Sequence, residues 1–141
     1  HAHADAVVAA RRRFDRLGTA PILGEERELP LALAEELAYA GDVLGARAYV
    51  KRFDEQPPAS RMRVREDPRE RAHRSFVEAV IADAAGEDRA AHAWYRRAFG
   101  IYRRIGYERR AVLAALRLGE LTGNPHLLEY AETTLRKRAR G

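Results

Sequence analysis

The sequence predicts an all-α fold: a right-handed array of about three antiparallel helix hairpins plus a leading helix, in one domain spanning residues 1–141. Apolar residues recur at helical spacing along most of the chain, and glycine or proline separates one apolar stretch from the next. Only residues 61–65 alternate as a strand does, and one isolated strand cannot form a sheet. The pattern therefore favours helices throughout.

The first two predicted helices cover residues 2–17 and 30–40. In the leading helix, apolar residues return at helical spacing, and Gly18 can end it in a left-handed conformation. Residues 19–29 contain proline and glycine and are predicted as a loop. The second helix ends at Gly41.

The next two helices begin at aspartates that can act as N-caps. Asp42 opens a helix that reaches about residue 54, before Pro57 and Pro58. Residues 59–66 form a polar connection. Asp67 and Pro68 then give a strong helix start, because the proline loses nothing at the first helical position. That helix is predicted to reach residue 85.

Three more helices are predicted over residues 87–105, 107–122 and 125–136. Gly106 and Gly123 separate them. Gly100 lies inside the first of the three and could kink it, since glycine costs about 1 kcal/mol relative to alanine in a helix. Beyond residue 136 we expect the basic tail to fray.

Composition limits the functions open to this chain. It has 141 residues, no cysteine, and 26 basic against 21 acidic residues, a formal net charge of +5. The lack of cysteine excludes a disulfide framework, thiol catalysis and cysteine-ligated metal sites. No apolar run approaches the ~18 residues of a membrane span, and residues 1–5 do not resemble a signal peptide. We therefore expect a cytoplasmic protein without a membrane partner.

A hairpin unit recurs along the chain. Gly41, Gly86 and Gly123 each separate two predicted helices, at intervals of 45 and 37 residues. A small residue follows five positions after the first two glycines, Ala46 and Ala91. Only a small side chain lets two helix axes approach to ~8–10 Å. We therefore expect these alanines at the hairpin crossings.

The unit resembles the tetratricopeptide-repeat family. Its best copy reads Ala34-x-x-Leu37-x-x-x-Gly41-Asp42-x-x-x-Ala46-x-x-x-Val50-x-x-Phe53-x-x-x-x-Pro58. Phe53 departs from the family, which prefers alanine there. The second copy matches better late than early, and the third is degenerate, with Leu128 at a usual alanine position. The resemblance implies a stacked-hairpin scaffold.

Residues 90–111 show a narrower resemblance, to the irregular repeats of bacterial signalling proteins such as the sensor arms of LuxR-type ATPase transcription regulators. There the repeats bind inducers or partner proteins. The resemblance implies a non-catalytic scaffold or sensor module that binds a protein, a peptide or a small-molecule inducer. The chain starts inside what looks like the second helix of a repeat, so we expect a piece of a larger protein.

In this family the first helix of each hairpin lines a concave groove. Carried onto this sequence, the groove positions are Glu35, Tyr39, His73, Phe76, Val80, Asp83, Arg110, Leu113, Arg117 and Glu120. Their mixed charge would suit a peptide or polar ligand.

The sequence contains no convincing catalytic or metal site, so we predict neither an enzyme nor a cofactor. The two serines, Ser60 and Ser75, lie outside any nucleophile motif. His73, His92 and His126 fall on three different helices without a ligand-type spacing.

Two alternatives to the scaffold stay open. Arg96, Arg97, Arg103 and Arg104 recur in stripes and could bind nucleic acid, although we favour solvated arginines beside core aromatics and expect only weak binding at physiological salt, with no sequence preference. The second alternative is self-association through the apolar stripe of residues 2–17, which lacks a hairpin partner. A homo-oligomer would follow.

Overall fold

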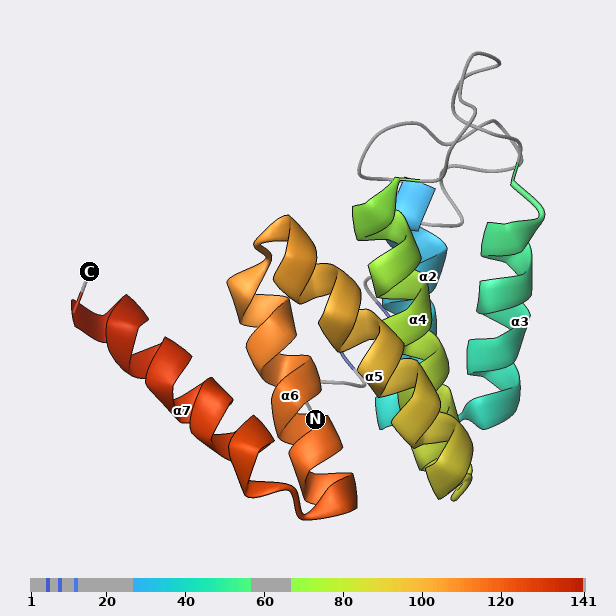
Figure 1. Cartoon of the computed structure of the whole chain (residues 1–141). Coiled ribbons are helices and arrows are strands. Elements are labelled where there is room, and N and C mark those ends of the chain that lie inside the picture. Colours follow the sequence, from blue (N-terminus) through green and yellow to red (C-terminus); the bar gives the residue numbers. More distant parts are fainter. Residues whose placement is uncertain (1–4, 6–7, 9–11, 13–26, 57–66, 141) are drawn as a thin grey trace.

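The computed structural model describes Asp5, Val8 and Arg12 and residues 27–56 and 67–140, and these are all-α. The six helices are α2 (Leu29–Tyr39), α3 (Val43–Asp54), α4 (Pro68–Ala84), α5 (Asp88–Ile105), α6 (Glu108–Thr122) and α7 (Pro125–Arg140). They form three consecutive hairpins (Figure 1). The predicted fold class is confirmed, and its handedness stays a prediction.

The helix boundaries follow the predicted signals. Asp42 accepts a hydrogen bond from the Gly45 backbone N–H, and Asp67 caps α4 in the same way through the Arg69 N–H. Gly41, Gly86, Gly106 and Gly123 all have positive φ, the left-handed region that glycine enters without strain. Each lies between two helices, as predicted.

One expectation about helix ends was wrong. The last helix was expected to fray after residue 136, but α7 continues to Arg140. Arginine and lysine are good helix formers, and positive charge in the last turn is favourable beside the negative end of the helix dipole. α5 includes Gly100 as part of one continuous helix.

The core lies between the hairpins and is built largely from alanine. Ala46 and Ala91 are both fully buried, as their predicted place at the hairpin crossings requires. Larger side chains pack within the second hairpin: Phe76 of α4 meets Tyr95 of α5 edge to face, with ring centroids 5.5 Å apart. Burial of these small and aromatic residues fixes α4 and α5 against each other.

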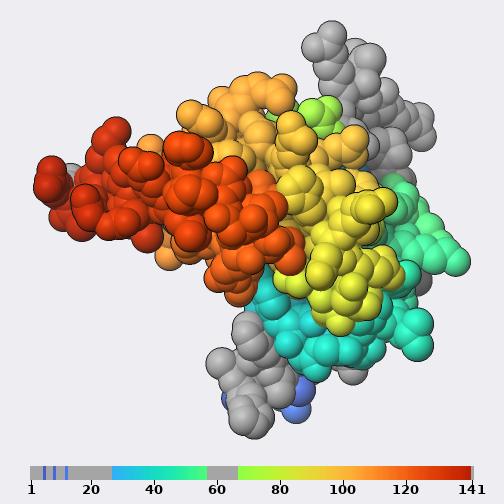
Figure 2. Space-filling view, turned by 60° about the horizontal axis from the view of Figure 1, so that its bottom comes forward, coloured from blue at the N-terminus to red at the C-terminus, as the bar shows by residue number. Residues whose placement is uncertain are grey.

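The last hairpin differs from the others because α7 packs mainly on α6. Its single buried residue is Ala131. The two helices approach closely near the turn, where a Cβ on Gly119 would lie 2.8 Å from Leu128 Cδ2. Away from the turn they diverge, and α7 projects from the body of the molecule (Figures 1 and 2).

Several predicted segments lie outside the described residues. These are most of the leading helix 2–17, with its proposed self-association, and the polar connection 59–66. Among the residues that the structure describes, no helix is both long and apolar enough to cross a membrane.

Candidate functional site

Three of the predicted groove residues meet in a row across the first helices of the three hairpins. Glu35 of α2 lies between His73 of α4 and Arg110 of α6. The His73 Nε2 atom is 3.5 Å from the Glu35 Oε1 atom, and Arg110 Nη1 donates a hydrogen bond to the same oxygen at 3.1 Å. The row links residues that lie 75 positions apart in the chain.

Two residues that the sequence analysis missed extend this row. The Glu28 side chain lies 2.8 Å from His73 Nδ1 and 3.1 Å from Arg69 Nη2. Glu28 precedes α2 and Arg69 lies in the first turn of α4, so neither falls on the repeated groove positions used for prediction. A possible signal is that both are charged residues close to a helix start.

Contacts within the row shift the pKa values of its histidine and its two glutamates. Burial disfavours a charged His73, but its contacts with Glu28 and Glu35 outweigh this, so the pKa of His73 is raised. The hydrogen bond with His73 lowers the pKa of Glu28. Burial raises the pKa of Glu35, yet His73 and Arg110 reverse that effect and leave it lowered. The row therefore alternates basic and acidic side chains.

The prediction that Phe76 and Val80 face the groove was wrong. Phe76 is fully buried and Val80 is 3% exposed, so neither can touch a ligand. They occupy the contact between α4 and its neighbours, and Arg110 covers the Phe76 ring at 5.3 Å from its centroid. The protein's own side chains thus fill the middle of the predicted groove.

The remaining predicted residues make no ion pair with this row among the described residues. Tyr39 is half-buried, and burial raises its pKa. Asp83 and Glu120 are exposed, and Arg117 is paired with Glu120 at 3.3 Å. Leu113 instead faces a cleft, together with Arg110.

That cleft is the open end of the last hairpin and encloses about 790 Å³. One wall is a face of α6, with Arg109, Val112, Leu113 and Leu116 at helical spacing. The other wall is α7, which contributes Leu135 and Arg138. Of the residues that line the cleft, Arg110 and Leu113 were predicted, and the others, Leu116 and Leu135 among them, were not.

An ion pair spans the mouth of the cleft. Arg138 Nη1 of α7 lies 3.3 Å from Glu108 Oε2 of α6. Leu135, one turn before Arg138, keeps 51% of its surface exposed. The site therefore offers apolar walls, a charged rim and an exposed leucine.

The structure separates the four arginines of the nucleic-acid alternative. Arg96, Arg97 and Arg104 line one groove of about 810 Å³ beside α5, together with Arg71 of α4. Arg103 points elsewhere, over the rings of Phe99 and Tyr130.

The Ser75 hydroxyl donates to the Arg71 backbone carbonyl, so it is engaged within its own helix. Within the described part of the chain, no group of three or more histidine and carboxylate side chains is placed to hold a metal ion. No protein-family model, curated protein or solved structure matches this chain.

Proposed function

We propose that this chain is a non-catalytic binding module, and that the cleft between α6 and α7 holds an amphipathic helical segment of a partner protein. The observation that carries the proposal is the cleft itself, which joins apolar walls to a basic rim at the end of a helical array. A helix laid into a groove between two helices is a recurring mode of peptide recognition.

The apolar walls support a helical ligand. Val112, Leu113 and Leu116 form one stripe, and Leu135 faces them from α7. Burying the half-exposed Leu135 side chain would stabilise a complex by about 25 cal/mol for each Å² of apolar surface removed from water. Leucines at positions i, i+3 and i+4 of a ligand would fill such a trough.

The rim indicates the charge of the partner. Arg109, Arg110 and Arg138 lie around the cleft against the single carboxylate of Glu108. Arg109 is exposed and makes no ion pair with any residue in 27–56 or 67–140. The complementary ligand carries acidic residues beside its apolar stripe.

The buried row gives this site a rigid base. Arg110 belongs both to the cleft and to the row, where Glu35 and the Phe76 ring hold it. As part of the same proposal, the module serves a larger bacterial signalling or transcriptional regulatory protein. The resemblance of residues 90–111 to sensor repeats is the support for that role.

The test is fluorescence anisotropy with a designed amphipathic peptide that carries a leucine stripe flanked by glutamates. We expect binding that Leu135→Asp weakens at least about tenfold, because truncating an anchor residue of an interface typically costs about 2 kcal/mol or more. Leu44→Asp is the matched control: Leu44 is 83% exposed on α3, outside the cleft, and should leave the affinity unchanged.

A second peptide, with lysines in place of the glutamates, tests the charge argument. We expect it to bind more weakly than the acidic peptide. Equal loss of affinity in Leu135→Asp and Leu44→Asp, or preference for the lysine peptide, would contradict the proposal. A concentration-dependent mass in light scattering, abolished by Leu135→Asp, would instead identify a second copy of the chain as the occupant.

A further inference from the structure

The groove beside α5 differs in charge from the cleft between α6 and α7, which Glu108 helps to line. Its basic lining residues are Arg71, His92, Arg96, Arg97 and Arg104, and no acidic side chain lines it. All four arginines are exposed, and none forms an ion pair with an acid in residues 27–56 or 67–140. Several positive charges thus gather here without an acidic partner in the described part of the chain.

The neighbouring groove, between α3 and the α4–α5 hairpin, makes the contrast clear. There Arg47 lies 3.2 Å from Glu87, and Arg74 forms a two-bonded pair with Asp54 at 2.8 Å. Internal pairing of this kind neutralises an arginine surface. The groove beside α5 lacks it and therefore attracts an anionic ligand.

Gly100 adds an independent observation. It lies in the middle of α5 and lines the same groove, and a Cβ placed there would meet nothing within 4 Å. Packing inside the protein therefore does not require a glycine, although glycine is unfavourable in a helix interior. A bare backbone at this position lets a ligand approach the floor of the groove closely.

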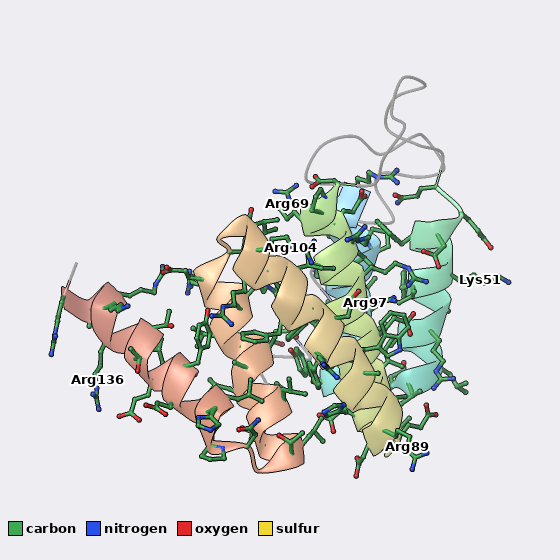
Figure 3. All side chains as sticks on the ribbon, in the orientation of Figure 1. Lys51, Arg69, Arg89, Arg97, Arg104 and Arg136 are labelled. Carbon is green, nitrogen blue, oxygen red and sulfur yellow. The ribbon has the colours of Figure 1, made fainter. Side chains whose placement is uncertain are left out.

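The type of anion follows from the side chains present. Arginine matches phosphate geometry with two parallel hydrogen bonds. Arg97 and Arg104 are seven residues apart on one face, about 10 Å along the helix axis, so they can contact different phosphates of one ligand (Figure 3). Exposed arginines in an open groove suit a polymer that runs past the protein.

We infer that this groove binds the phosphate backbone of nucleic acid without reading its sequence. No aromatic side chain lines the groove, so bases have no stacking platform there. Arg97 is already held over the Trp94 ring, 5.3 Å from its centroid, which orients its guanidinium before binding. This inference is separate from the proposed peptide site on α6 and α7.

The experiment measures anisotropy of a labelled mixed-sequence DNA, single-stranded and duplex, between about 50 and about 200 mM salt. Each phosphate contact contributes about 0.7–0.9 log units of affinity per log unit of salt, so four arginines predict a slope of about −3. We expect measurable binding at low salt and only weak binding at physiological salt, with no preference among DNA sequences.

Paired variants separate the groove from general charge attraction. Arg97→Glu with Arg104→Glu should lower the affinity at least about tenfold at low salt and make the slope shallower. Arg89→Glu with Arg136→Glu changes the net charge equally, at exposed sites outside the groove (Figure 3), and should have little effect. The acidic-peptide affinity should not change with the groove variant.

Gly100→Leu fills the groove floor without altering charge, and it should weaken DNA binding while circular dichroism shows an intact helical fold. Equal losses from the two arginine pairs, or no binding at low salt, would overturn the inference. The inference would also be overturned if inorganic polyphosphate bound in a way that the groove variant abolishes while neither single-stranded nor duplex DNA bound. That result would identify free polyphosphate as the ligand.

Discussion

Arg110 of α6 donates a hydrogen bond to Glu35 of α2 across 75 residues of sequence, with 3.1 Å between Nη1 and Oε1. The Glu35 side chain is 11% exposed and the Arg110 side chain 34%. This contact joins the first helix of the first described hairpin to the first helix of the last. It couples the base of the α6–α7 cleft to the rest of the array.

The first prediction concerns this pair. Arg110→Leu leaves the Glu35 carboxylate with one fewer donor in a buried position, so we expect a loss of about 1–3 kcal/mol in the free energy of unfolding. Urea unfolding measures it. Arg109→Leu, at the exposed neighbouring position, should stay within about 0.5 kcal/mol of the parent. Direct coupling predicts an interaction energy of about 0.5–3 kcal/mol between Arg110→Leu and Glu35→Leu in a double-mutant cycle. If the two single losses of stability simply add in the double variant, the coupling is contradicted.

The second prediction is the pH dependence that His73 imposes. Its pKa is raised on folding, so its stabilisation is complete below about pH 6.5 and is lost as pH rises through the raised value. Glu28 and Glu35 have lowered pKa values, so their contribution is complete above about pH 4.3 and is lost as pH falls through those values. Stability should therefore be greatest between the two limits.

Urea unfolding over a pH series tests this dependence. His73→Asn should flatten the decline on the alkaline side. His126→Asn is the control, because the His126 side chain is 88% exposed on α7. If both variants keep the slope of the parent, His73 is not the group responsible.

The third prediction tests the hairpin crossings. Ala91→Leu adds three carbons at a fully buried position, and overpacking of this kind costs about 1–3 kcal/mol. Ala46→Leu should behave alike. Ala93→Leu makes the same change at an exposed position on α5 and should leave thermal unfolding nearly unaltered. An unchanged melting temperature for Ala91→Leu would rule out the close crossing.

The fourth prediction contrasts two glycines. Gly100→Ala should raise stability by up to about 1 kcal/mol, because alanine favours helix and its Cβ has room. Gly86→Ala should lower stability by about 1–2 kcal/mol, because Gly86 has φ of +76°. Thermal unfolding of the two variants should shift in opposite directions, and a shift in the same direction would contradict this account.

The helices could be predicted closely because their signals are local. Asp67 caps α4 and Pro68 begins it, as predicted, and Gly106 ends α5 at the predicted residue. N-caps and left-handed glycines act within one turn, so the neighbouring sequence contains the information. The end of α7 was missed because no residue there stops a helix, and charge alone suggested fraying.

The site could be predicted only in part because it depends on how helices pack. Helical periodicity and the repeat resemblance placed Glu35, His73 and Arg110 on the same side of the array. They could not show that Phe76 is buried, since this depends on how closely α4 approaches its neighbours. Glu28, Leu116 and Leu135 were missed for the same reason: their partners lie on other helices.

The close approach of Leu128 to Gly119 holds the two helices of the last hairpin together near their turn. Near the turn α7 packs closely on α6, whereas toward its far end the exposed Arg138–Glu108 ion pair connects the two helices. Exposed ion pairs contribute about 0–1 kcal/mol, so we expect the Arg138–Glu108 pair to break before the packing of Leu128 on Gly119 does. In the proposed complex, a ligand bound to Leu135 would act on the weakly held end of α7, where a small rotation about the turn gives the largest displacement.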